Sequence, residues 1–76
     1  MEVCYMSPDM VIANSNGAEM QVNPIKKTVQ VYGNHPGTQT TQSFNELLRE
    51  LGVDMRIVRS GNQDNKLKAV PLKEMI

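Results

Sequence analysis

The residue types that most often act as nucleophiles or proton carriers are scarce in this sequence, which contains one cysteine, Cys4, and one histidine, His35. A catalytic nucleophile needs a base beside it and a further group that orients the base. Cys4 and His35 lie far apart in the chain, and nothing in their spacing brings them together. We therefore expect Cys4 to be a small buried apolar side chain, His35 to be an exposed loop residue, and the protein not to be an enzyme.

Sites for metals and cofactors are not predicted either. Metal ions bind clusters of histidine, cysteine or carboxylate side chains, and the sequence shows no such cluster. Residues 33–43 share glycines and hydroxyl groups with phosphate-binding loops, but no lysine stands where the Walker pattern needs one. We expect no cofactor. We interpret residues 33–42 as a surface loop that is either a linker or a recognition loop, in which Asn34 and His35 are candidate contact residues.

A basic ribbon is predicted at residues 54–70, where two short strands flank a polar connection. Alternation along these strands places Arg56, Lys66 and Lys68 on one side, away from apolar residues on the other. Arg59 lies near the end of the first strand. Such a face can contact nucleic-acid phosphates or an acidic protein surface, or it can face solvent and protect the strand edges. No aromatic residue lies in the ribbon, which argues against stacking on RNA or single strands.

The clearest strand signal is Asn16-Gly17, a dipeptide that favours a type I′ hairpin turn because both residues need a positive φ. A turn at this position pairs the residues before it with those after it. The pairing separates a mostly apolar face from a mostly polar one, as a half-buried sheet requires. The predicted pairs are Ser15 with Ala18, Ala13 with Met20, and Val11 with Val22.

A helix is predicted at residues 43–52. Ser43 and Glu46 have the spacing of a capping box at its start, and Gly52 follows the last turn as a C′ residue. The apolar residues of this segment recur at helical spacing and form one stripe that can pack on a sheet. They are Phe44, Leu47, Leu48 and Leu51.

The whole chain, residues 1–76, is expected to form a single small α+β domain: a mostly antiparallel sheet of about five strands with one helix (about 43–52) packed on one face. The helix is short and would be marginal alone, so it must lie on the sheet. Residues 72–76 are expected to form a short helical turn or a flexible tail. Besides the hairpin, the sequence predicts strands at residues 26–32, 53–59 and 66–70, and an edge strand at residues 3–6.

The composition favours a protein that binds rather than one that reacts. Eight basic and eight acidic residues cancel, which argues against a strong, non-specific nucleic-acid or membrane binder. Residues 1–25 contain no Lys or Arg, whereas residues 54–76 are mildly basic. Six methionines supply much of the apolar bulk and suit either a core or a partner-binding face. One cysteine, no long apolar run and no signal-peptide pattern predict a cytoplasmic protein without a membrane partner.

From these features we expect a small non-enzymatic interaction protein, an inhibitor, adaptor or regulator, that binds a larger partner protein. The alternative is a nucleic-acid-binding regulator that uses the basic ribbon at residues 54–70. Free sheet edges and an uncovered sheet face also favour a two-fold homodimer. Small proteins without familiar motifs are often encoded by phages or mobile elements, and such an origin is a hypothesis for this chain.

Overall fold

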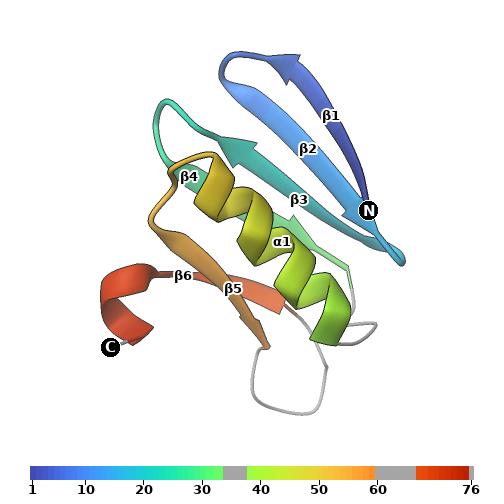
Figure 1. Cartoon of the computed structure of the whole chain (residues 1–76), viewed down its shortest axis with the longest axis vertical. Helices are drawn as coiled ribbons and strands as arrows, with labels where there is room; N and C mark the ends of the chain where they lie inside the picture. The colour runs from blue at the N-terminus through green and yellow to red at the C-terminus, as the bar shows by residue number, and fades with distance from the viewer. Residues whose placement is uncertain (34–37, 60–66, 76) are drawn as a thin grey trace.

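The computed structural model describes residues 1–33, 38–59 and 67–75. In these residues the chain forms a four-stranded antiparallel sheet, a two-stranded sheet and one α-helix, so the predicted α+β class is confirmed (Figure 1). The single sheet expected from the sequence is instead divided into two. The elements are, in chain order, β1 (Glu2–Ser7), β2 (Met10–Ser15), β3 (Ala18–Asn23), β4 (Thr28–Tyr32), α1 (Thr38–Glu50), β5 (Met55–Arg59), β6 (Leu67–Pro71) and the 3₁₀-helix η1 (Leu72–Met75).

Strands β1 to β4 follow one another as a meander, each antiparallel to the next (Figure 1). In the turn between β2 and β3, φ is 51° at Asn16 and 87° at Gly17, the positive values that a type I′ turn requires. The predicted register is confirmed, with Ser15 paired to Ala18 and the other pairs following from it. All of these paired residues except Ser15 are buried, so the apolar face of the hairpin packs inward.

Helix α1 begins at Thr38, more than a turn before the start that the sequence predicts. The predicted capping box at Ser43 and Glu46 is therefore wrong, because both residues lie inside the helix. Residues 38–42, which were expected to belong to a surface loop, form the first five residues of α1.

The reason for the early start is Thr40. This residue lies one turn before Phe44 on the same side of the helix, and it is 1% exposed. Its Oγ1 lies 3.2 Å from the Oγ of Ser15 and accepts a hydrogen bond of 3.4 Å from the Nδ2 of Asn16. A polar residue thus extends the buried stripe because the β2–β3 turn satisfies its hydroxyl.

The C-terminal end of α1 is as predicted. Gly52 has a φ of 71°, and its N–H donates to the carbonyl of Arg49 at 3.2 Å, while the N–H of Val53 donates to the carbonyl of Leu48 at 3.0 Å. These two bonds form a Schellman motif. The Nζ of Lys27 donates to the carbonyl of Gly52 at 2.8 Å, which ties the β3–β4 turn to this end of the helix.

The core lies between α1 and the apolar face of the four-stranded sheet, with the β5–β6 pair beside the helix (Figure 1). The helix contributes Phe44, Leu47 and Leu48 to it, and each is at most 2% exposed. The buried apolar residues form one cluster. Its remaining members are Val11, Ala13, Ala18, Met20, Val22, Val53, Ile57 and Leu67.

Asn45 of α1 covers the outer side of β5. The Nδ2 of Asn45 donates to the carbonyl of Ile57 at 3.1 Å, and the Oδ1 of Asn45 accepts from the N–H of Ile57 at 2.7 Å. The side-chain amide thus takes the place of a neighbouring strand. Strand β6 lies beside β4, and η1 is joined to the ribbon where the N–H of Leu72 donates to the carbonyl of Asp54 at 2.9 Å.

Candidate functional site

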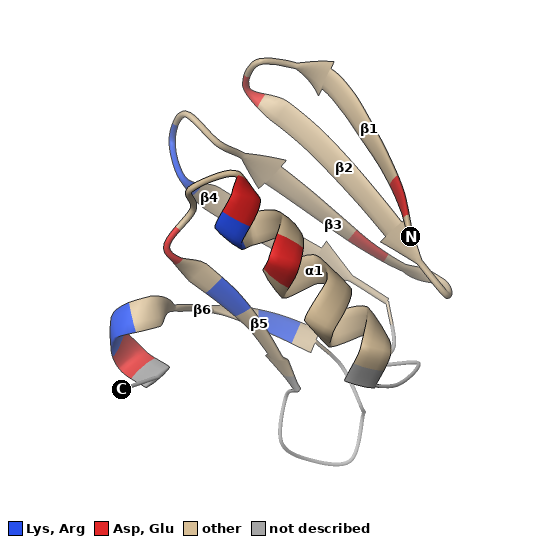
Figure 2. Ribbon diagram, in the orientation of Figure 1, with Lys and Arg blue, Asp and Glu red and all other residues tan. Residues whose placement is uncertain are grey.

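Two of the predicted basic residues, Arg56 and Lys68, lie on the same face of the β5–β6 pair. The register pairs Arg56 with Val70 and Val58 with Lys68, and directly paired residues of antiparallel strands share a face. Figure 2 shows one basic segment on each of these strands. The predicted common placement of Arg56 and Lys68 is therefore confirmed, although two half-buried valines complete the face.

Arg56 is held against its own strand. It is half-buried, and its Nη1 donates to the carbonyls of Val53 at 3.0 Å and Met55 at 2.6 Å. These bonds engage part of the guanidinium before any partner arrives. Among the described side chains of this face, Lys68 is the exposed cation.

The other predicted contact residues are only partly placed. Arg59 is paired with Leu67 through the backbone of the β5–β6 pair. Lys66, Asn34 and His35 lie outside the described residues. Their part in a binding site stays a prediction.

Cys4 is exposed, so the expectation that it is buried is wrong. The physical reason is its position: it lies in the outermost strand and is paired with Ile12, on the sheet face opposite the helix. Its Sγ donates to the Sδ of Met6 at 3.2 Å. His35, the other residue considered for a reactive pair, lies outside the described residues.

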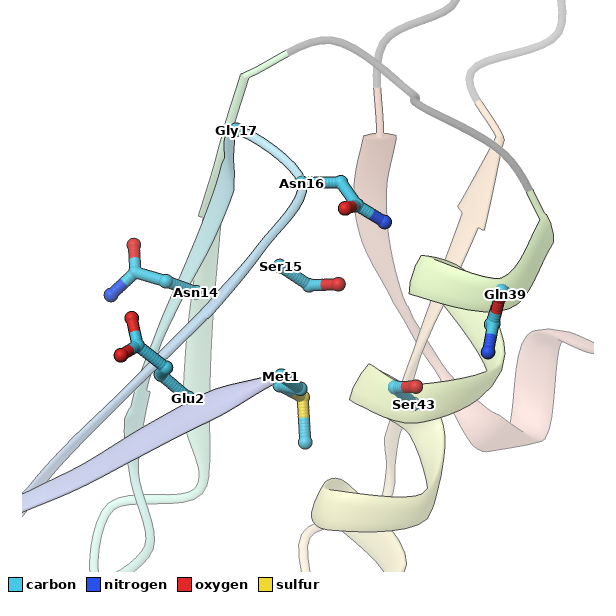
Figure 3. A pocket seen from close by; sticks show the side chains of 8 residues that line it. All are labelled: Met1, Glu2, Asn14, Ser15, Asn16, Gly17, Gln39 and Ser43. Atoms are coloured by element: carbon cyan, nitrogen blue, oxygen red, sulfur yellow. The ribbon is translucent and has the colours of Figure 1, made fainter.

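A pocket of about 520 Å³ opens between the start of β1, the β2–β3 turn and the N-terminal half of α1 (Figure 3). Ser15 and Asn16 point toward the helix, whereas Glu2 and Asn14 point away from it (Figure 3). Hydroxyl and amide groups dominate its walls. The described part of this lining can form hydrogen bonds with a polar ligand.

Two kinds of feature are absent from the described residues. In residues 1–33, 38–59 and 67–75, no three His, Cys, Asp or Glu side chains gather closely enough to hold a metal ion. The helical segments in this part of the chain are too short or too polar to cross a membrane.

The most exposed apolar side chains of the sheet lie on β1. Tyr5 is 66% exposed and Met6 is 61% exposed. Tyr5 is paired with the buried Val11 and therefore shares the helix-facing side of the sheet, but α1 does not reach over β1 (Figure 1). Natural edge strands are commonly protected by lysine, and residues 1–25 have neither Lys nor Arg.

The backbone direction of β2 follows from its turn. In an antiparallel pair, hydrogen-bonded pairs of residues alternate with pairs that are not hydrogen-bonded. A two-residue type I′ turn makes its flanking residues, Ser15 and Ala18, a hydrogen-bonded pair. The N–H and C=O groups of Ser15 thus point toward β3, and those of Asn14 and Ile12 point toward β1.

The same alternation places the backbone groups of β1. Asn14 is paired with Glu2, and Ile12 with Cys4, so Glu2 and Cys4 direct their N–H and C=O groups toward β2. Val3 and Tyr5 then direct theirs to the opposite side. No described residue lies there (Figure 1). We call this outer side of β1, with its four free backbone groups and the side chains of Val3, Tyr5 and Met6, the β1 edge.

The sequence predicted a strand at residues 3–6 but did not mark it as a site. The signal that could have marked it was a run of apolar residues in a segment without basic residues. Comparisons with protein-family models, with curated proteins and with solved structures find no match for this chain. The geometry of the β1 edge therefore carries the functional proposal.

Proposed function

We propose that this protein is a non-enzymatic interaction protein, an inhibitor, adaptor or regulator, that binds a larger partner protein by strand addition at the β1 edge. The observation that supports this most directly is the outward direction of the backbone N–H and C=O groups of Val3 and Tyr5. An extended segment of a partner can hydrogen-bond to these groups and continue the sheet.

The side chains of β1 define the kind of segment that fits. Partner residues on the helix-facing side would lie beside Val3 and Tyr5, where an apolar side chain removes the most apolar surface from water. The charged residue of β1 is Glu2, which is exposed. The expected segment therefore alternates apolar with polar residues and carries Lys or Arg next to Glu2.

Selection from a phage-displayed library of random peptides on the immobilised protein tests the proposal. We expect enrichment of peptides with the alternating pattern. Their binding should be lost in Tyr5→Pro, because proline removes an outward N–H that the sheet does not use. Ile25→Ala is the matched control: it changes a similarly exposed apolar side chain in the β3–β4 turn, and it should leave binding unchanged.

Two outcomes would contradict the proposal. One is a set of enriched peptides that bind Tyr5→Pro as tightly as the unchanged protein. The other is a selection that enriches nothing above a blank surface. Circular dichroism of Tyr5→Pro should match that of the unchanged protein, which separates loss of binding from loss of folding.

The nucleic-acid alternative stays a prediction. Arg56 and Lys68 share a face, but Arg56 is partly engaged by its own backbone. Binding through about three to five phosphates would give a log–log salt slope of roughly −3 to −5 on duplex DNA. A mobility-shift assay at low salt measures whether any such binding exists.

A further inference from the structure

We propose that, when no partner is bound, the β1 edge pairs with the β1 edge of a second copy of this chain around a two-fold axis at Cys4. The proposal rests on the proposed function in that both use the same edge. It adds the identity of one occupant, the register of the pairing, and a consequence for regulation.

The free backbone groups of β1 are self-complementary. An antiparallel pairing centred on Cys4 places Val3 of one copy opposite Tyr5 of the other, and the two-fold axis repeats this pair. Because the groups of both residues point outward, each of the two pairs is a hydrogen-bonded one. All free N–H and C=O groups of Val3 and Tyr5 in both copies are then satisfied.

Neighbouring registers do not achieve this. A pairing centred on Val3 places Tyr5 opposite residue 1, which lies before the start of β1. A pairing centred on Tyr5 places Val3 opposite Ser7, beyond the register shift between Tyr5 and Ser7. Because a bulge interrupts the regular hydrogen-bonding direction of its strand, Cys4 is the centre that uses both free residues before the strand becomes irregular.

The side chains also fit the Cys4-centred register. The two-fold axis runs perpendicular to the sheet, so both copies present their helices on the same face and the two sheets join. Val3 of each copy meets Tyr5 of the other on that face. Their contact covers apolar surface, above all that of Tyr5, which is exposed in the unpaired chain. The Glu2 residues of the two copies lie at opposite ends of the paired segment, so the pairing opposes no like charges.

Cys4 gives the register a chemical readout. Its backbone groups point toward β2, so the two copies of Cys4 form a pair that is not hydrogen-bonded, with Cα atoms about 4.5 Å apart. This separation falls within the range of roughly 4.4–6.8 Å that a disulfide spans. Added diamide can therefore join the two thiols: they lose two protons and two electrons, the S–S bond forms, and diamide is reduced to the hydrazine.

The pairing has a regulatory consequence. A partner segment and a second copy need the same free groups of Val3 and Tyr5, so they compete for the β1 edge. Only unpaired chains can bind a partner, so the apparent affinity for the partner falls in proportion to the fraction of chains that remain unpaired. It also covers an edge that would otherwise promote uncontrolled strand pairing.

The experiment is diamide cross-linking of the full chain in the micromolar to millimolar range, read on non-reducing gels, together with the molar mass in solution. Two controls carry the cysteine elsewhere on the Cys4→Ser background. In Val3→Cys the thiol faces the helix side and lies opposite Tyr5, and in Thr28→Cys it lies on β4, at the far side of the sheet.

We expect the native cysteine to cross-link at least about tenfold faster than either control, because strand pairing raises the effective thiol concentration. The molar mass should rise toward that of a dimer with concentration and remain that of a monomer in Tyr5→Pro. Equal cross-linking at all three positions, or a monomer at every concentration, would overturn the proposal. Peptide binding that survives in such a monomer would leave the proposed function standing, whereas a dimer without peptide binding would reject that function and keep this inference.

Discussion

At the scale of single residues, the fold depends on a few polar contacts that no apolar pattern reveals. Thr40 is buried because the turn residues Ser15 and Asn16 satisfy its hydroxyl, and an unsatisfied hydroxyl at that depth would be costly. The positions of these three residues in the sequence give no sign that they meet. The early start of the helix could therefore not be predicted from the chain alone.

Gly33 is required by contact as well as by conformation. Its φ is 100°, and a Cβ at this position would lie 2.8 Å from the carbonyl oxygen of Gly17 and 3.0 Å from the Cα of Ala18. Gly17 also has a positive φ, of 87°, but a Cβ there would meet nothing within 4 Å. An alanine at Gly17 would therefore cause backbone strain alone, whereas an alanine at Gly33 would cause backbone strain and steric overlap.

We predict that Gly33→Ala lowers the free energy of unfolding by about 1–3 kcal/mol more than Gly17→Ala does, because the added methyl group meets backbone atoms that cannot move aside. Urea denaturation of both variants measures the difference. Equal losses would show that the close approach of Gly33 to the β2–β3 turn is not a constraint on the fold.

At the scale of elements, the sequence is informative where one short motif decides the structure. The β2–β3 register predicted from Asn16-Gly17 is confirmed, and so is the end of α1 predicted from Gly52. The start of α1 was wrong because Ser43 and Glu46 match a capping box by spacing alone. The division into two sheets was missed because Asn45, a side chain, covers the edge of β5 in place of a strand.

The position of Ser43 inside the helix gives a direct test. We predict that Ser43→Ala raises the free energy of unfolding by a few tenths of a kcal/mol, because alanine has the higher helix propensity and no cap is removed. A true N-cap would instead lose about 1 kcal/mol. Thermal or urea denaturation distinguishes the two signs, and a loss of that size would contradict the helix start at Thr38.

The contact between Asn45 and Ile57 gives a second test at this scale. We predict that Asn45→Ala lowers the free energy of unfolding by about 2–3 kcal/mol, because it leaves the N–H and C=O of Ile57 without their partner. Gln42→Ala, an exposed position of the same helix, is the control and should change stability by no more than about 0.5 kcal/mol. Equal effects of the two substitutions would mean that water replaces the amide at the edge of β5.

At the scale of the whole molecule, the outer edges of β4, β5 and β6 each lie against another described element, whereas the outer edge of β1 does not. Helix α1 covers β5 through Asn45, and β4 and β6 lie side by side. Strand β1 has β2 on one side and no described residue on the other (Figure 1). The site predicted from charge includes Arg56, which is half-buried and bonded to its own backbone. The β1 edge, which has no basic residue, offers the free backbone groups. Charge is visible in a sequence, but the direction of a backbone group depends on register.

The most direct test of these free groups is amide hydrogen exchange, measured by NMR at a protein concentration low enough to keep the chain monomeric. The N–H of Cys4 should exchange slowly because it bonds to β2, while those of Val3 and Tyr5 should exchange at rates close to those of an unfolded chain. Adding a selected peptide should slow Val3 and Tyr5 and leave Cys4 unchanged. Equal protection of all three amides in the free monomer would contradict an open β1 edge and the functions proposed for it.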